Sequence, residues 1–134
     1  MAERDNMREI LFKAKRIDNG EWVEGCYIHT DQKNEFEHRI QPFDPQRFAP
    51  PIKIDTLCQY IGSIDKNGNK IWENDIIIAD SRMFTVHYYE PFAMYMLKGI
   101  GHGGGTNGMN VQLANSEVIG NIFDNPELLV TTEN

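Results

Sequence analysis

The chain lacks several features by which a protein's class is often recognised. No apolar run is long enough to cross a bilayer, and residues 1–6 are polar, without the apolar centre of a signal peptide. Basic residues are fewer than acidic ones, 13 against 20, which gives a net charge of −7. Because nonspecific binding to DNA or RNA comes from Lys and Arg that neutralise phosphates, this balance weighs against a nucleic-acid-binding protein. We therefore expect a cytoplasmic protein without membrane association.

Cysteine is also scarce, and the motifs that identify common enzymes and metal proteins are missing. Cys26 and Cys58 form no Cys-x-x-Cys pair, and no Gly-x-Ser-x-Gly occurs. The histidines have no zinc-ligand spacing, apart from a weak grouping of His38 with Glu35 and Glu37. We expect reduced thiols that pack as small hydrophobic side chains. We assign no catalytic residue, no metal site and no cofactor, and we lean away from an enzyme.

Turn and strand signals are what the sequence does contain, and they are densest in residues 59–80. Asn67-Gly68 is a strong hairpin signal, for which a type I′ turn with positive φ at both positions is expected. A second turn at Asn74 precedes residues 76–78, which are three consecutive isoleucines. Such a run, apolar on both faces, indicates a strand that is covered on both sides.

This stretch resembles the signature of the YopX family of phage and prophage proteins. The matching runs are Gln59-Tyr60-Ile61-Gly62, Asp65-Lys66-Asn67-Gly68 and Lys70-Ile71-Trp72-Glu73-Asn74-Asp75-Ile76-Ile77, with Met7-Arg8-Glu9-Ile10 before them and Val118-Ile119-Gly120-Asn121-Ile122 after them. Asn74 stands where the family more often has Gly, and Ile61 where it has Thr; Asn still tolerates positive φ. The resemblance implies a protein of a bacterial host's cytoplasm, and it brings no activity or catalytic residues.

The remaining chain is also predicted to be mainly strand. Residues 10–28 indicate a hairpin that turns at residues 18–20. Its expected inner faces are Ile10, Phe12 and Ala14 on the first strand and Trp22, Cys26 and Ile28 on the return strand. Residues 42–51 hold four of the six prolines and are predicted to be an ordered irregular connection, with a helical turn near Pro45. Pro126 predicts a second helical turn, capped by Asn125.

The fold class that follows is mainly β, either a small barrel or a partly open, strongly bent antiparallel sheet with SH3-like character and short helical turns. We expect one domain over residues 7–129, preceded by an extension and followed by a tail. Its parts are a hairpin lobe (7–41), a Pro-rich connection (42–51) and a main β body (52–129), with the extension at 1–6 and the tail at 130–134.

The glycine-rich segment 99–108 is the nearest approach to a ligand-binding motif. It contains Gly-x-Gly-x-x-Gly, but a dinucleotide site needs a strand before the motif and a helix after it. The residues that follow predict strand, so we interpret the segment as a flexible hairpin loop. Because such a loop can become ordered on a ligand, His102 with Gly101 and Gly103 is kept as a candidate binding site.

Polar residues at the turns are interpreted as structural, and exposed aromatic residues as interfaces. Asp65, Asp75 and Asn121 are predicted to accept backbone N–H groups of the residues that follow them. The candidate interface residues are Trp22, Phe43, Phe48, Trp72 and Tyr89.

Three functions are compatible with these patterns. The leading hypothesis is a non-enzymatic accessory protein that binds a protein partner of unknown identity and also self-associates into a homo-oligomer. A second is a small-ligand-binding protein or enzyme that uses the glycine-rich loop. A third, which the acidic charge disfavours, is nucleic-acid binding through Arg8, Lys13, Lys15, Arg16 and Trp22.

Overall fold

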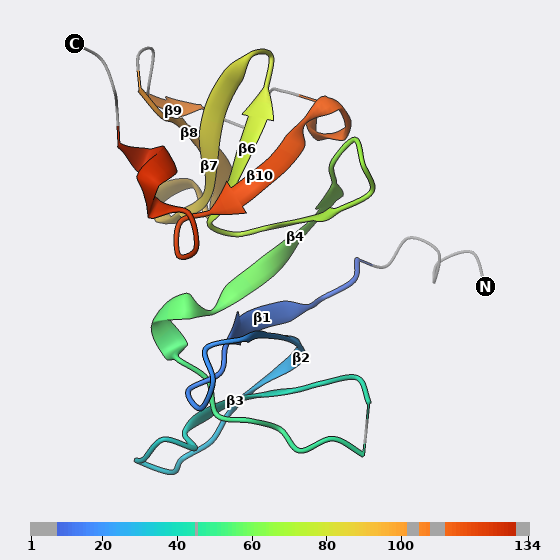
Figure 1. Cartoon of the computed structure of the whole chain (residues 1–134), viewed down its shortest axis with the longest axis vertical. Helices are drawn as coiled ribbons and strands as arrows, with labels where there is room; N and C mark the ends of the chain where they lie inside the picture. The colour runs from blue at the N-terminus through green and yellow to red at the C-terminus, as the bar shows by residue number, and fades with distance from the viewer. Residues whose placement is uncertain (1–7, 45, 102–104, 108–111, 131–134) are drawn as a thin grey trace. The chain divides into compact units, whose positions relative to one another are not determined.

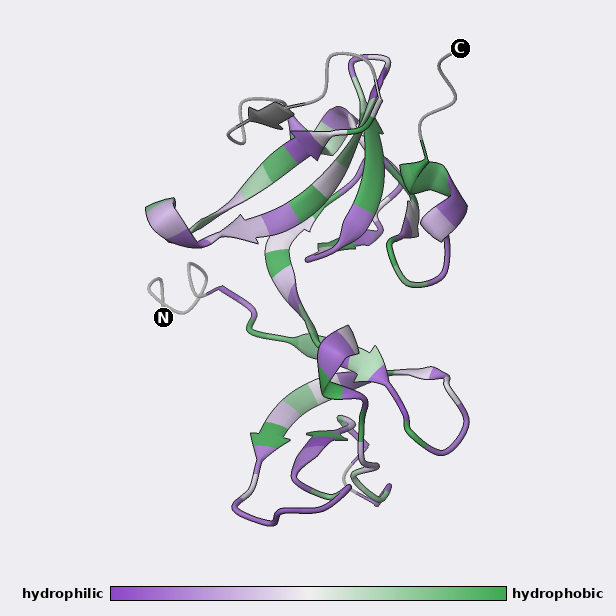
Figure 2. Ribbon diagram, turned by 90° about the vertical axis from the view of Figure 1, so that its left-hand side faces the viewer, coloured by the Kyte–Doolittle hydropathy of each residue, from purple (hydrophilic) through white to green (hydrophobic). Residues whose placement is uncertain are grey.

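The computed structural model describes residues 8–44, 46–101, 105–107 and 112–130 of the 134-residue chain. The chain divides into two compact units, an N-terminal unit that ends at Tyr60 and a C-terminal unit that begins at Ile61. Each unit is built on antiparallel strands that are joined by turns (Figure 1). In Figure 2, apolar and polar residues alternate along many of these strands, as the two faces of a half-buried sheet require.

The N-terminal unit is a four-strand arrangement in the order β3-β2-β1-β4. Its strands are β1 (Phe12–Lys15), β2 (Trp22–His29), β3 (His38–Gln41) and β4 (Cys58–Ile64), and η2 (Ile54–Thr56) is a 3-10 turn. The predicted hairpin at residues 10–28 is thus confirmed, with β1 paired to β2. Beyond residue 60, β4 continues into the C-terminal unit and neighbours β5 (Lys70–Trp72).

The face of β2 that packs inward differs from the predicted one. Ala14, Ile40 and Ile52 form the buried core of this unit, and Val23 and Tyr27 pack against it. The prediction had chosen the other face of β2, the one that carries Cys26, and Cys26 is exposed. The sequence misleads here because both faces of β2 carry apolar residues. Only Cys58, which is 1% exposed, packs as a buried thiol.

The Pro-rich segment belongs to the N-terminal unit and is hydrogen-bonded to it through Arg47 and again at its last residues. Ala49, Pro50, Pro51 and Ile52 are buried. Their backbone is bonded to the sheet, since Ile52 N–H donates to the His38 carbonyl at 3.0 Å. Upstream, Asp44 accepts the Gln46 N–H at 3.1 Å in a local turn.

The C-terminal unit is a five-stranded antiparallel sheet in the order β10-β6-β7-β8-β9. Its strands are β6 (Asp75–Ala79), β7 (Arg82–Tyr89), β8 (Met94–Gly99), β9 (Gly105–Asn107) and β10 (Glu117–Asn121), and its 3-10 turns are η3 (Glu90–Phe92), η4 (Leu113–Asn115) and η5 (Pro126–Leu129). One face of β6, β7 and β8 forms the core with the buried residues Ile77, Phe84, Val86 and Leu97. Two of the three consecutive isoleucines are fully buried, and Ile78 is 40% exposed.

The turns at Asn67-Gly68 and Asn74 lie where the sequence predicts them, but the first of them is of a different type. Asn74 has a φ of 74°, as expected of an Asn that replaces Gly. At Asn67-Gly68, however, positive φ is found only at Gly68 (83°), so the type I′ prediction is wrong there. Instead, the side chain of Asp65 stabilises this loop by accepting the Asn67 and Asn69 N–H groups. Two adjacent residues with positive φ occur instead between β6 and β7, at positions 80 and 81.

Three polar residues serve these turns, in part as predicted. Asp65 also accepts the Val118 N–H of β10 at 2.9 Å, and Asn121 accepts the N–H groups of residues 123 and 124. Asp75 accepts the backbone N–H of Trp72, a residue that precedes it, at 2.8 Å. Asn125 does not cap η5 as predicted, because its side-chain oxygen accepts the Asn121 N–H instead.

The architecture therefore confirms the mainly β prediction at the level of two antiparallel sheets. Across the described ranges the helical segments are all 3-10 turns, with no α-helix, and the strands close into no barrel. In place of the small barrel or single bent sheet that the sequence suggested, the described strands form two antiparallel sheets. No helix in the described part of the chain is long and apolar enough to span a membrane.

Candidate functional site

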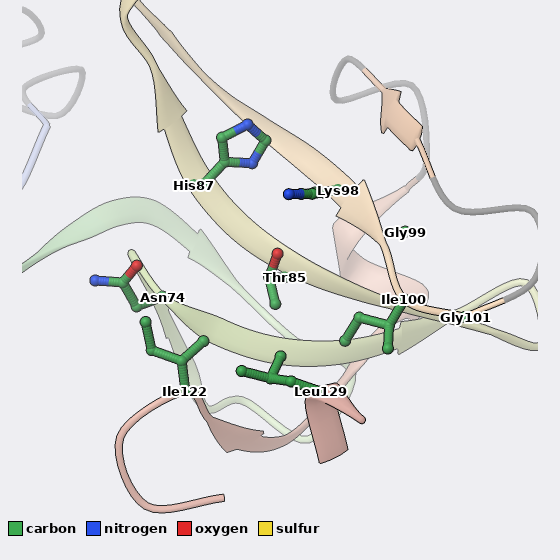
Figure 3. A pocket seen from close by; sticks show the side chains of 9 residues that line it. All are labelled: Asn74, Thr85, His87, Lys98, Gly99, Ile100, Gly101, Ile122 and Leu129. Carbon is green, nitrogen blue, oxygen red and sulfur yellow. The ribbon is translucent and has the colours of Figure 1, made fainter. Parts of the chain in front are cut away.

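A pocket of about 490 Å³ lies against the face of the β7–β8 hairpin that is turned away from the core. Thr85 and His87 share this face because they are two residues apart on β7, and Lys98 of β8 lies directly opposite Thr85. Figure 3 shows these three side chains above the apolar side chains of Ile122 and Leu129. The other lining residues are Asn74, Gly99, Ile100 and Gly101. The volume is within the usual range of small-molecule sites, roughly 300–1,000 Å³.

His87 gives this pocket its chemical character. Its Nδ1 atom is buried and has no hydrogen-bond partner. A buried polar atom left in this way costs about 1–3 kcal/mol, and a ligand that bonds to it removes the cost. Lys98 adds an exposed ammonium group on the neighbouring strand. The pocket is thus suited to a small ligand with a negatively charged group and a hydrogen-bonding group.

A second polar constellation lies at the end of the β2–β3 hairpin in the N-terminal unit. His29 and His38 are opposite each other in the register, and their rings stack with centroids 4.6 Å apart. Glu37 Oε2 lies 3.0 Å from His29 Nε2 and 3.5 Å from His38 Nε2. The Tyr27 hydroxyl lies 2.6 Å from the other nitrogen of His38, Nδ1. Hydrogen bonds therefore join Tyr27 to His38 and His29 to Glu37, and the His38 ring lies beside the Glu37 carboxylate.

The charges of this constellation are coupled. The hydrogen bond from His29 lowers the pKa of the Glu37 carboxyl, against the opposing effect of its partial burial. Burial, and then the negative charge of Glu37, raises the pKa of the Tyr27 hydroxyl. At neutral pH Glu37 is therefore a carboxylate and Tyr27 a neutral phenol.

The end of the β7–β8 hairpin is covered by aromatic residues on both of its faces. Tyr88 and Tyr95 are opposite each other, with ring centroids 5.4 Å apart in an edge-to-face contact. On the other face, the rings of Tyr89 and Phe92 make a similar contact at 5.1 Å. Phe92 is 64% exposed, Tyr88 47% and Met94 40%. We call Tyr88, Tyr89, Phe92, Met94 and Tyr95 the aromatic tip.

Comparison with models of protein families matches residues 11–130 to the YopX protein family. The chain belongs to the YopX family. The match takes in the described strands of both units of this YopX protein, together with the pocket, the histidine constellation and the aromatic tip. Comparison with curated proteins finds no match.

The glycine-rich segment of this YopX protein contributes to the pocket with its first residues. Gly101 lines the pocket and has a φ of 81°, a conformation that favours glycine. His102 and Gly103 lie outside the described residues. The sequence thus indicated the neighbourhood of the pocket, whereas His87 and Lys98 were missed because neither lies in a recognisable motif.

The candidate interface residues of the YopX protein fall into different environments. Phe43 and Phe48 are each 64% exposed in the loop before the buried prolines. Tyr89 is half-buried and belongs to the aromatic tip. Trp22 is covered by Lys13, whose ammonium group lies 4.6 Å from the ring centroid. Trp72 is only 4% exposed, and we leave it out of any surface.

The histidine constellation was almost invisible in the sequence of this YopX protein. The sequence indicates a weak grouping of His38 with Glu37, its neighbour. His29, however, lies eight residues before Glu37 in the chain. Only the β2–β3 register brings His29 opposite His38. The pair could be recognised in the sequence only if the register of the β2–β3 hairpin were already known.

Proposed function

We propose that this YopX-family protein is a phage or prophage accessory protein, non-enzymatic, that binds a protein partner through the aromatic tip. The observation that carries the proposal is the exposure of Tyr88, Phe92 and Met94 together at one hairpin end. Tyr, Phe and Met are enriched in the centres of protein interfaces, and exposed apolar groups of this kind gain from burial on binding. The net charge of −7 favours a protein over a nucleic acid as the partner.

The aromatic tip also has the rigidity that a binding surface needs. Residues 88 and 89 of β7 are paired with residues 95 and 94 of β8, so the backbone beneath the rings is part of the sheet. The edge-to-face contacts hold the rings before a partner arrives, which lowers the entropy lost on binding. A host or phage protein is the proposed partner. Self-association through the same rings is the alternative, and the SH3-like character of the central hairpin remains part of the proposal.

The combined change of Tyr88→Ser and Phe92→Ser tests this function. We expect it to weaken binding of the partner at least 100-fold, because aromatic hot spots contribute about 2–4 kcal/mol each when truncated. Capture from infected-host lysate identifies the partner, and titration of the purified pair gives the affinity. The stability of the variant should change little, because both side chains are exposed.

A matched variant at the Pro-rich loop controls that experiment. Phe43→Ser with Phe48→Ser removes two aromatic side chains, each 64% exposed, from the other unit. We expect this variant to leave the affinity for the partner unchanged. Loss of binding in this variant, with full binding by the tip variant, would overturn the assignment. Light scattering after size exclusion at high protein concentration separates self-association from a foreign partner.

A second function, binding of a small anionic ligand, is favoured by the buried, unpaired nitrogen of His87 beside Lys98 in the pocket. A thermal-shift screen with phosphate and nucleotides should then raise the melting temperature, since saturation at 100 times the Kd stabilises by about 2.7 kcal/mol. His87→Ala or Lys98→Ala should abolish the shift, and the exposed Lys53→Ala should not. No shift with any anion would remove this function, and His102→Ala tests the glycine-rich loop in the same screen.

A further inference from the structure

The donor atoms at the end of the β2–β3 hairpin converge as the ligands of a metal ion do. His29, Glu37 and His38 each offer one ligand atom, and these atoms all lie within 4.8 Å of one another. Ligands about 2.0–2.1 Å from a tetrahedral metal are roughly 3.3 Å apart. The two separations from Glu37 Oε2, 3.0 and 3.5 Å, lie on either side of that value. The rings of His29 and His38 stack with their planes 21° apart, so at least one ring has to rotate before both nitrogens face the same ion.

The hydroxyl of Tyr27 orients the ring of His38, one of the three ligands. This hydroxyl lies 2.6 Å from His38 Nδ1 and leaves Nε2 directed toward Glu37. Metal-binding histidines are usually oriented in this way, by a hydrogen bond to the nitrogen that does not bind the metal. When His38 Nε2 binds a metal, its proton moves to Nδ1, which then donates to the Tyr27 oxygen. The imidazole remains neutral throughout, as a metal ligand must.

The kind of ion follows from the donor set. Two imidazoles and one carboxylate suit Zn²⁺ and its neighbours in the first transition row, whereas Ca²⁺ and Mg²⁺ prefer sites made of oxygen atoms. The His29 side chain is 56% exposed, so the fourth position is open to water or to a ligand from a partner. We propose that His29, Glu37 and His38 bind Zn²⁺, with Tyr27 as the positioning residue for His38. This site is separate from the aromatic tip and does not depend on the function proposed above.

Calorimetric titration of tag-free protein with ZnCl₂ tests the site. The background should carry Cys26→Ser, because the exposed thiol of Cys26 is itself a zinc ligand. We expect one ion per chain at pH 7.5 and at least tenfold weaker binding at pH 5.5, because protons compete with the metal for its ligand atoms. His29→Ala should weaken binding at least tenfold without unfolding the exposed hairpin end, and Glu37→Gln should act similarly.

Two further variants separate binding from structure. Tyr27→Phe keeps the ring but loses the hydroxyl, and we expect a roughly tenfold loss of affinity. Glu35→Gln, at an exposed carboxylate near the site but outside the three ligands, should bind Zn²⁺ like its parent. Co²⁺ provides a spectroscopic reading, because intense visible absorption indicates a tetrahedral site. The proposal fails if Zn²⁺ does not bind in the micromolar range, or if His29→Ala and Glu37→Gln bind it as tightly as their parent does.

Discussion

Replacing Asp65 with alanine is expected to lower the free energy of unfolding of the C-terminal unit by about 3 kcal/mol. The carboxylate accepts three backbone N–H groups, those of Asn67, Asn69 and Val118, each at 2.9 Å. Asp65 is only 3% exposed, so water does not replace the lost acceptor freely. A buried donor without a partner costs about 1–3 kcal/mol, and here three lose their acceptor together.

Urea unfolding measures this effect in the right unit. The two tryptophans lie one in each unit, so in a Trp22→Phe background the fluorescence reports on Trp72. Asp65→Asn should be destabilised as well, because its amide group can accept with only one oxygen. The exposed Glu127→Ala should stay within about 0.5 kcal/mol of its parent. An unchanged urea midpoint for Asp65→Ala would contradict the structural role.

The same carboxylate makes the stability of this unit depend on pH. Burial raises the pKa of Asp65, but the hydrogen bonds from Val118, Asn69 and Asn67 outweigh it and hold the pKa below the ordinary 3.8. The folded state therefore binds this proton less readily than the unfolded state. Its contribution is fully present above pH 3.8 and is lost as the pH falls through the lower, folded-state pKa. The difference in stability between wild type and Asp65→Asn should shrink in that acidic window.

Replacing Gly25 with alanine is expected to destabilise the N-terminal unit by about 3 kcal/mol. A Cβ at this position would lie 2.0 Å from the carbonyl oxygen of Gln41 and 3.0 Å from the Cα of Pro42. Both are backbone atoms, so no side-chain rotation relieves the overlap. The chain that leaves β3 has to move away from β2, and the pairing of Cys26 with Gln41 is weakened.

Fluorescence of Trp22 in a Trp72→Phe background follows this unfolding. Cys26→Ala is a change of similar size at the next residue. It should leave the free energy of unfolding within about 0.5 kcal/mol of the parent, because Cys26 is exposed. Equal stability of Gly25→Ala and wild type would contradict the close approach of the chain after β3 to β2.

Local chemistry explains what the sequence could predict about the fold. The turn at Asn74 and the turn at Gly20 follow from residues that adopt positive φ, whatever the rest of the chain does. The consecutive isoleucines could be assigned to a covered strand for the same reason, because β-branched side chains favour a pleated backbone. Strand existence was therefore predictable from segments of a few residues.

What the sequence could not supply are the contacts made across long separations. The bond from Val118 to Asp65 spans 53 positions and converts a simple Asn-Gly turn into a loop organised by a carboxylate. The inner face of β2 depends on where the chain after β3 packs, and both faces of that strand looked apolar. The pocket and the histidine constellation depend on strand register, which decides that His29 meets His38 and that Lys98 meets Thr85.

The exposure of Cys26, together with the burial of Cys58, makes selective chemical labelling straightforward. A maleimide dye added to the native protein will attach to β2 alone, so no engineered cysteine is needed. Such a dye lies on the same strand as His29 and would be quenched by Cu²⁺ or Co²⁺ held nearby. Its anisotropy would also rise when a partner protein docks, so one conjugate can report on both proposals in the same cuvette.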